Sequence, residues 1–256
     1  MQGILIVDKP AGWTSFDVIA KMRGVLGTRK LGHSGTLDPM ATGVLPVFCG
    51  GASKAVDLQL DHDKTYRAGP QMQVPPMYSA VKVDGQPLYK AARQGITVER
   101  KARPIEIYSI RYEGSPAPGE YALTVRCSKG TYIRTLLEDI AAGMGQLGAM
   151  SALRRTQAGL FTEAGAHTLE EILAAKEAGP EALAGLLLPV ERVFDPLPLL
   201  TVDRRTAAHL YNGCPTSRYP AADGRYRVRD EAGQFLGLAQ VAGGVLRVEK
   251  LFVERT

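Results

Sequence analysis

The hydrophobic and polar positions at the start of the chain predict a strand, a helix and a second strand. Residues 3–7 form a continuous apolar run, which favours a buried strand that ends at a loop containing Pro and Gly. From Ser15 onward the apolar residues fall near helical spacing, with Thr14 or Ser15 as the N-cap and Gly27 as the stop. A second short apolar run, residues 44–48, predicts another buried strand.

The rest of the chain continues with helical and extended patterns. We expect helices at residues 53–60, 87–95, 135–144, 169–178 and 204–211. We expect one strand that begins at Tyr66, and further strands at residues 104–112, 121–127 and 153–159. Short strands are expected after residue 212. Several prolines crowd the chain near residue 197, which indicates a domain boundary between residues 1–197 and 198–256.

The charge of the chain is distributed unevenly. The 256 residues carry a net charge of +5. Residues 82–134 hold ten Lys or Arg against five Asp or Glu, whereas residues 163–198 hold two against seven. One part of the surface should therefore be positive and attract a polyanion such as RNA. A solvated basic face without a partner is the competing interpretation.

The three cysteines are far apart and have neither a Cys-x-x-Cys arrangement nor a His at ligand spacing. The spacing indicates neither a disulfide framework nor a zinc site, and we expect three buried thiols. No apolar run is long enough to span a bilayer, and the first residues lack the pattern of a signal peptide. We expect a cytoplasmic, monomeric protein.

Asp38 is the candidate reactive residue, because it is a single carboxylate in a loop of small residues. Gly32, Gly35 and Gly43 allow backbone angles and close approaches that a side chain would forbid. Pro39 biases Asp38 away from helical angles, so we expect Asp38 to be extended on a rigid loop. An Asp before Pro also often does no more than bond its own backbone in a turn, and this remains the competing interpretation.

The whole string 32–46, Gly-His-Ser-Gly-Thr-Leu-Asp-Pro-Met-Ala-Thr-Gly-Val-Leu-Pro, closely resembles the active-site motif of the TruB family of tRNA pseudouridine synthases. Residues 3–12, 75–85 and 128–134 match the same family in order. The resemblance implies an α+β fold with a mixed, largely antiparallel sheet flanked by helices and a small C-terminal β-rich, PUA-like RNA-binding domain. It also implies that Asp38 is catalytic, and that the protein binds the T-arm of tRNA and isomerises a T-loop uridine.

This reaction requires no cofactor. It breaks the C1′–N1 glycosidic bond, rotates the uracil and joins C5 to C1′, so that nothing is oxidised and no group arrives. The sequence accordingly has no dinucleotide fingerprint, phosphate-binding loop or metal cluster. A carboxylate that acts as nucleophile or base at the sugar or the uracil suits the task. We therefore expect neither a cofactor nor a metal.

The resemblance assigns Arg134 as the partner of Asp38 and Tyr132 as a substrate contact. A carboxylate shielded from water tends to keep its proton unless a cation lies nearby, so an ionised Asp38 needs such a partner. On an extended segment the i, i+2 spacing of Tyr132 and Arg134 would put both side chains on one face. The competing interpretation is a core tyrosine and a surface arginine.

Four more residues match the family pattern. By resemblance, Tyr66 stacks on the flipped base, His33 occupies space in the opened RNA loop, and Leu153 contacts the uracil. Lys9 supports the site without reacting. For His33 a structural role, and for Leu153 a place in the core, are the competing interpretations.

The chain departs from the family pattern after Ala68, where several dozen residues are absent. Either part of the catalytic domain is lost or the sequence is joined across an absent segment, and we favour the second because deleted strands would expose backbone groups. The loss keeps open a non-catalytic tRNA-binding or tRNA-folding protein of the same fold. A nucleotidyltransferase is disfavoured, because Thr36 stands where its His-x-Gly-His motif needs the second His.

Overall fold

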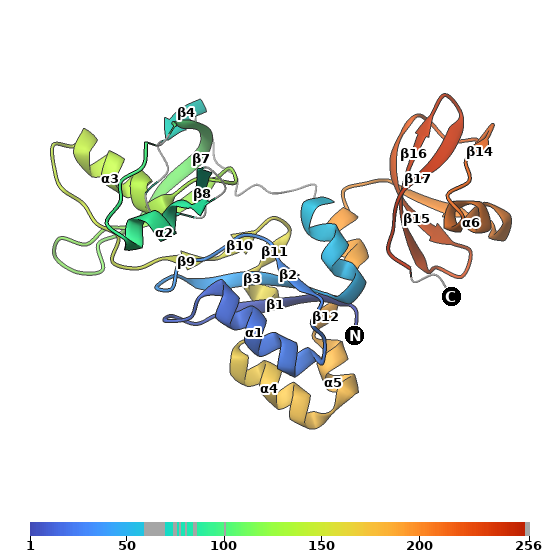
Figure 1. Ribbon diagram of the computed structural model, residues 1–256, viewed down its shortest axis with the longest axis horizontal. Helices are drawn as coiled ribbons and strands as arrows, with labels where there is room; N and C mark the ends of the chain where they lie inside the picture. Colours follow the sequence, from blue (N-terminus) through green and yellow to red (C-terminus); the bar gives the residue numbers. More distant parts are fainter. Residues whose placement is uncertain are drawn as a thin grey trace. The chain divides into compact units, whose positions relative to one another are not determined.

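A computed structural model describes most of the chain. The described residues are 1–58, 70–73, 76, 78–79, 81–83, 86–99 and 101–253. They fall in two compact units (Figure 1), which are Met1–Asp61 with Arg154–Thr256, and His62–Leu153. Tyr66 and the strand predicted from it lie outside the described residues.

The first unit contains a five-stranded sheet. Its strands are β1 (Gly3–Lys9), β2 (Leu31–His33), β3 (Thr42–Cys49), β9 (Arg154–Arg155) and β12 (Leu187–Leu188). Strand β3 pairs antiparallel with β1 and β2 and parallel with β9, and β12 pairs antiparallel with β1. Because β9 pairs with the first two residues of β3, Arg155 lies directly beside the end of the loop that carries Asp38.

Strands β1 and β3 are buried on both faces. Ile4, Ile6 and Phe48 belong to one hydrophobic cluster. Leu5 and Leu45, which are also fully buried, point to the opposite face because side chains alternate along a strand. Helices α1 (Ser15–Leu26) and α4 (Leu169–Ala178) contact β3 and β1 respectively. This double burial explains why both strands are continuous apolar runs in the sequence.

Helix α1 confirms the predicted start and stop signals. The Thr14 hydroxyl accepts from the Asp17 N–H at 3.0 Å, the Asp17 carboxylate accepts from the Thr14 N–H at 2.8 Å, and Gly27 ends the helix with φ +63°. The helix predicted at 53–60 is instead the 3₁₀-helix η1 (Gly50–Leu58). Two glycines open it and the Ser53 hydroxyl donates to the Gly50 carbonyl at 2.8 Å, which favours tight local bonding over an α-helix.

The remaining short elements of this region follow Arg155. They are β10 (Gln157–Ala158), β11 (Phe161–Thr162), η2 (Glu163–Gly165), α5 (Pro180–Gly185) and η3 (Val190–Phe194). The strand predicted at 153–159 is divided into β9 and β10, because the chain changes partner from β3 to the hairpin strand β11. The acidic helix predicted at 169–178 is confirmed as α4.

The C-terminal region is a curled β half-barrel. Its elements are β13 (Leu199–Val202), α6 (Arg204–Tyr211), β14 (Thr216–Ser217), β15 (Gly224–Asp230), β16 (Phe235–Ala242) and β17 (Val245–Leu251). The sheet order is β13-β15-β16-β17-β14, with only β13 and β15 parallel among these pairs. Leu210 of α6 packs with Val228 and Leu236 in a separate hydrophobic cluster, so the region has its own core.

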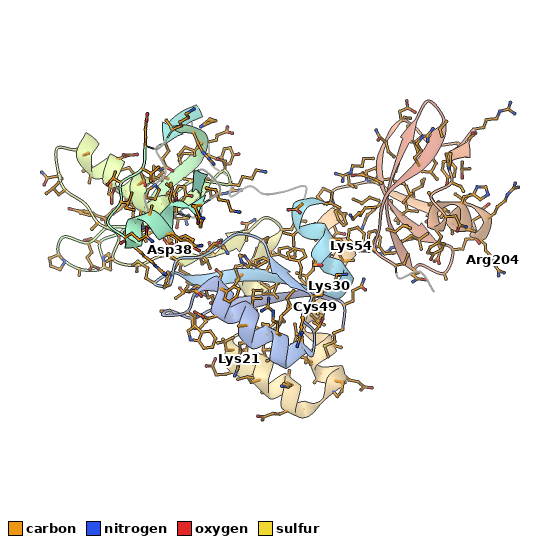
Figure 2. All side chains as sticks on the ribbon, in the orientation of Figure 1. Lys21, Lys30, Asp38, Cys49, Lys54 and Arg204 are labelled. Atoms are coloured by element: carbon orange, nitrogen blue, oxygen red, sulfur yellow. The ribbon has the colours of Figure 1, made fainter. Side chains whose placement is uncertain are left out.

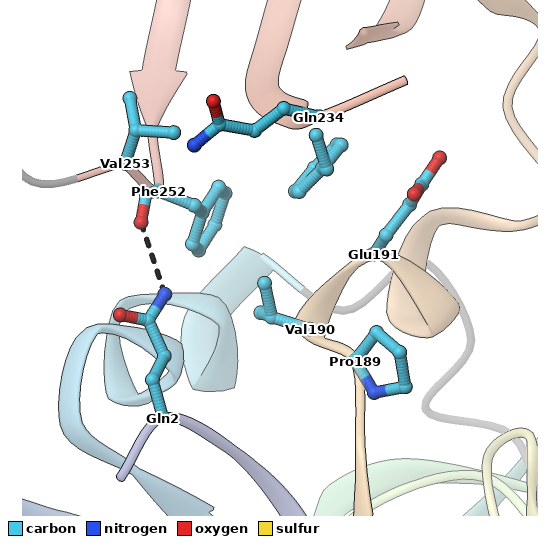
Figure 3. Close-up of a pocket in the computed structure, with 8 residues that line it drawn as sticks. Gln2, Pro189, Val190, Glu191, Gln234, Phe252 and Val253 are labelled. Carbon is cyan, nitrogen blue, oxygen red and sulfur yellow. Dashed lines mark hydrogen bonds between the residues drawn. The ribbon is translucent and has the colours of Figure 1, made fainter. Parts of the chain in front are cut away.

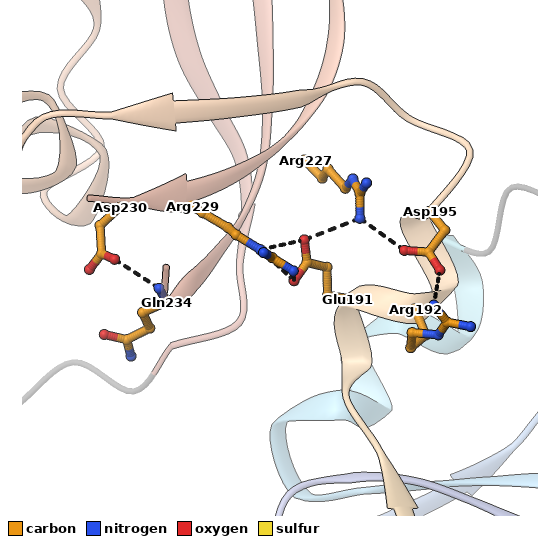
Figure 4. A network of polar contacts seen from close by, with 7 residues as sticks. All are labelled: Glu191, Arg192, Asp195, Arg227, Arg229, Asp230 and Gln234. Atoms are coloured by element: carbon orange, nitrogen blue, oxygen red, sulfur yellow. Dashed lines mark hydrogen bonds and ion pairs between the residues drawn. The ribbon is translucent and has the colours of Figure 1, made fainter. Parts of the chain in front are cut away.

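Two features attach the half-barrel to η3 and to the start of the chain. A hollow lined by Gln2, Val190 and Phe252 lies there, and the Gln2 amide donates to the Phe252 carbonyl at 3.0 Å (Figure 3). Beside it, the buried carboxylate of Glu191 accepts from Arg229 at 2.7 Å and from Arg227 at 3.3 Å (Figure 4). The predicted site residues do not line this hollow.

The second unit contains a three-stranded antiparallel sheet in the order β4-β7-β8. Its elements are β4 (Pro70–Gln73), β5 (Lys82–Val83), β6 (Gln86–Pro87), α2 (Leu88–Arg93), β7 (Arg103–Gly114), β8 (Ala122–Cys127) and α3 (Ile133–Gly143). Ile105, Ile107 and Cys127 of the sheet form a small core with Leu136 of α3.

The predicted fold class is confirmed as mixed α+β with largely antiparallel sheets and a C-terminal half-barrel. One prediction on cysteines is wrong: Cys49 and Cys127 are buried, but Cys214 is exposed because it follows the Asn212-Gly213 turn at the end of α6. The boundary at residue 197 stays a prediction. Among the described residues, no helix has the length and apolar character needed to cross a membrane.

Candidate active site

Asp38 lies in the loop between β2 and β3 (Figure 2), and its side chain is half-buried. Its carbonyl accepts from the Ala41 N–H at 3.0 Å, so Asp38 opens a turn. Both of its neighbours are anchored. The Leu37 N–H donates to the buried Ser15 hydroxyl at 2.9 Å, and the Pro39 carbonyl accepts from the Gly12 N–H at 2.8 Å. The backbone on each side of this carboxylate is therefore fixed.

The glycines of the loop have different roles. Gly35 (φ +89°) and Gly43 (φ +99°) adopt the predicted left-handed conformation, whereas Gly32 has no positive φ because it is part of β2. At Gly43 a side chain would also collide with the backbone carbonyl of Arg155. Only glycine allows β3 to approach β9 this closely, which confirms the expected close approach at this position.

Lys9 is fully buried at the end of β1. Its ammonium donates to three backbone carbonyls, those of Trp13 at 2.6 Å, Pro10 at 2.9 Å and Pro39 at 3.2 Å. Burial and the nearby charge of Arg155 lower the pKa of Lys9, while the carboxylate of Asp38 acts in the opposite direction. Lys9 thus ties the β1–α1 loop to the residue that follows Asp38, a geometry that fits the supporting role expected for it.

Arg155 contacts the same loop from the side of β9. Its Nε donates to the Val44 carbonyl at 2.8 Å, and one terminal nitrogen donates to the Gly35 carbonyl at 3.2 Å. Burial lowers the pKa of this guanidinium to about 10. The neighbouring Arg154 points elsewhere, since its guanidinium holds the Asp8 carboxylate with two hydrogen bonds at 2.8 and 3.0 Å.

His33 ends β2 and is half-buried beside the loop. Burial lowers the pKa of His33, and the charge of Arg155 acts in the same direction. The imidazole is therefore neutral at physiological pH. The expected role of His33, filling space in the opened RNA loop, stays a prediction.

The lowered pKa of His33 predicts a pH dependence of stability. Below the ordinary value of 6.5 the unfolded chain binds a proton on His33 while the folded chain does not. The free energy of unfolding should therefore fall as the pH decreases from 6.5 towards the lowered pKa. Urea unfolding at pH 7.5 and 5.5 should show a smaller fall in the His33→Gln variant than in the wild type. Equal falls in both proteins would contradict this assignment.

The second unit holds Tyr132, Arg134 and Leu153, all of them half-buried. The predicted extended segment is wrong, because Tyr132 is the N-cap of α3 and Arg134 lies in its first turn. The helix begins two residues earlier than the 135–144 pattern predicts. The reason is local: the buried Gln73 side chain donates to the Tyr132 carbonyl at 3.2 Å and accepts from its N–H at 2.9 Å, which fixes the backbone at the helix start.

Arg134 also has a partner in its own unit. Its guanidinium donates to the Tyr78 carbonyl at 2.9 Å. The predicted residues thus form two sets in the described chain, with Asp38, Lys9 and His33 in the first unit and Tyr132, Arg134 and Leu153 in the second.

Sequence reasoning missed two residues that hold these sets in place, Arg155 and Gln73. Arg155 gave a weak signal, because it lies two residues after Leu153, which matches the family pattern, within the strand predicted at 153–159. Gln73 gave none, since a single Gln in a strand is unremarkable and its partner lies far along the chain.

Comparison with solved structures shows the same fold. The chain matches a structure titled a Cbf5-Nop10-Gar1 complex with a TM-score of 0.74 and 24% identity, covering 98% of this chain and 85% of that one. It matches a structure of the archaeal box H/ACA sRNP Nop10-Cbf5 complex with a TM-score of 0.71 and 25% identity, covering 98% and 86%. The fold is thus one that occurs in RNA–protein particles.

Comparison of sequences then identifies the family. The N-terminal domain model of the TruB family pseudouridylate synthases matches residues 23–69 and 67–133, and the C-terminal domain model of tRNA pseudouridylate synthase B matches residues 134–195. The tRNA pseudouridine synthase B of Pseudomonas fluorescens (strain Pf0-1) is 40% identical over 94% of this chain and 92% of its own length. That of Ralstonia pickettii (strain 12J) is 38% identical over 98% and 94%. The chain belongs to the TruB family of pseudouridylate synthases, which confirms the resemblance and makes the chain an isomerase.

Proposed function

We propose that this chain isomerises a T-loop uridine of tRNA to pseudouridine and that Asp38 is its catalytic residue. The relatives that support the substrate are named tRNA pseudouridine synthase B. The observation that carries the assignment of Asp38 is the anchoring of both its neighbours, Leu37 by Ser15 and Pro39 by Lys9 and Gly12. Such fixation suits a group that must meet one atom of a substrate.

Apart from this carboxylate, the isomerisation requires few reacting groups. The C1′–N1 bond breaks, the free uracil turns in the site, and C5 bonds to C1′. C5 then loses its proton, and N1 takes up a proton. Asp38 acts as nucleophile or base at the sugar or the uracil. The site must also keep the uracil from leaving, which is the role we propose for Leu153 and Tyr132 beside the base, with Tyr66 stacked on it.

We propose Arg134 as the cation that keeps Asp38 ionised when RNA excludes water. A charged partner favours the carboxylate over the acid. His33 takes the space left by displaced bases of the RNA loop. For both residues the family motif is the support, together with the half-buried, solvent-reachable position of each side chain.

A second candidate function is tRNA binding without catalysis, which is favoured by signs that a segment is missing from the chain. The alignment with the Pseudomonas fluorescens relative extends over 286 positions, more than the 256 residues of this chain. The two matches of the N-terminal family model also meet at residues 67–69. Both facts agree with the proposal that a segment present in relatives is missing after Ala68.

The deciding experiment is to map pseudouridine in an unmodified tRNA transcript after incubation with this chain, using chemical labelling of the modified base. We expect one product, at a T-loop uridine. The control is the same transcript with that uridine replaced by cytidine, which should bind equally well and give no product. Tight binding of both transcripts without any product would support the second candidate and refute the first.

A further inference from the structure

We propose that Arg155 is a positioning residue for the isomerisation, one that fixes the Asp38 loop by joining its two ends. This inference rests on the proposed function, because it concerns the same carboxylate. Arg155 does not need to touch the substrate for this role. It acts through the backbone of the loop that carries Asp38.

The hydrogen bonds of Arg155 connect the two ends of this loop. Gly35 precedes Asp38 and Val44 follows it, and the carbonyls of both accept from the one guanidinium, at 3.2 Å and 2.8 Å. A guanidinium is planar and carries its donors in a fixed fork, so the two bonds set the separation of the two carbonyls. A lysine ammonium at the end of a flexible stem would impose no such geometry.

The backbone of Arg155 holds the same place. Strand β9 pairs in parallel with β3, so that Arg155 is the pairing partner of Gly43. The contact is so close that any side chain at Gly43 would collide with the Arg155 carbonyl. Main chain and side chain of one residue thus meet the loop at three points, Gly35, Gly43 and Val44.

Arg155 is half-buried, and its guanidinium is directed at the loop. Removing a guanidinium from water is unfavourable, and burial lowers the pKa of Arg155 to about 10. It still carries its charge at neutral pH. Within the described part of the chain, the guanidinium of Arg155 donates to two backbone carbonyls of the loop and not to a carboxylate, in contrast to that of Arg154, which binds Asp8 and Glu163.

The other residues that hold the Asp38 loop make different contacts from those of Arg155. Ser15, Gly12 and the Lys9 ammonium hold Leu37 and Pro39, next to Asp38, and the backbone of β1 pairs with Gly43 and Val44, but none of these contacts reaches Gly35. Without Arg155 the central residues and the β3 end would stay attached to α1 and β1, while the Gly35 end could shift relative to them. A displacement of about 1 Å in a reacting group can lower a rate about a hundredfold.

The test compares Arg155→Met and Arg155→Lys with the control Arg154→Lys, which retains charge on the same short strand but lies outside the loop contacts. For each protein, kcat and KM for pseudouridine formation in unmodified tRNA are measured. We expect kcat to fall about a hundredfold for Arg155→Met and about tenfold for Arg155→Lys, with KM unchanged, and no change for Arg154→Lys. A wild-type kcat for Arg155→Lys would show that the charge alone suffices and would overturn the proposal.

Hydrogen exchange supplies a readout that needs no activity. The amides of residues 35–43 should exchange faster in Arg155→Lys than in the wild type, while those of α4 should not change. Unaltered exchange in the loop would refute the fixation even if kcat fell. If the wild-type chain made no pseudouridine, the proposed function would fail, and the exchange result would still decide whether Arg155 holds the loop.

Discussion

Replacing Asp38 by Asn is expected to reduce pseudouridine formation at least about a thousandfold, because the substitution removes the carboxylate that we propose as the reacting group and keeps the shape of the side chain. Asn is also favoured in turns, so the Asp38–Ala41 turn should persist. The affinity for unmodified tRNA should change by less than about threefold, since one loop carboxylate contributes little to a contact dominated by phosphates. Single-turnover product formation and a filter-binding titration measure the two quantities.

The matched control for this prediction is Asp57→Asn. Asp57 lies exposed on η1, and the same substitution there removes the same charge without altering the loop. We expect its rate to equal that of the wild type. An Asp38→Asn variant that kept the wild-type rate would place the chemistry on another residue, and a variant that lost tRNA binding would show that the effect is not catalytic.

Much of the first unit could be predicted from the sequence because its signals are local. Helix α1 begins after Thr14 and ends at Gly27, as the capping pattern predicts, and the Asp38 loop follows from Gly35, Gly43 and Pro39 within one string. Lys9 is a useful case. The family resemblance indicated a supporting role, but only the structure shows how it acts, through three carbonyls from two separate loops.

The residues that sequence reasoning missed depend on contacts between distant parts of the chain. Arg155 is a loop anchor only because β9 pairs with β3, more than a hundred residues away. Gln73 fixes the backbone of Tyr132 across 59 residues, and this contact is also why α3 begins before Arg134. Propensity describes the middle of a helix better than its ends, since the end depends on whichever group satisfies the first free N–H and C=O.

Lys9→Met should be the most destabilising single substitution that we predict. Met fills nearly the same volume but removes the ammonium donor from the carbonyls of Pro10 and Trp13, while the carbonyl of Pro39 keeps its hydrogen bond from the Gly12 N–H. A buried polar group that loses its partner costs about 1–3 kcal/mol, and the gain from no longer burying an ammonium offsets part of the sum. We therefore expect the free energy of unfolding to fall by about 3 kcal/mol in urea titrations, against less than about 0.5 kcal/mol for the exposed control Lys21→Met.

The pH dependence separates this effect from a simple loss of packing. Because burial lowers the pKa of Lys9 below 10.5, the folded chain releases this proton at a lower pH than the unfolded chain does. In the window between the lowered pKa and 10.5 the unfolded state binds more protons, so this group makes the free energy of unfolding rise with pH. Lys9→Met should lack that rise, whereas Lys21→Met should retain it. If both variants followed the wild-type slope, Lys9 would be titrating as an ordinary surface lysine, and its role in holding the Asp38 loop through a buried charge would have to be abandoned.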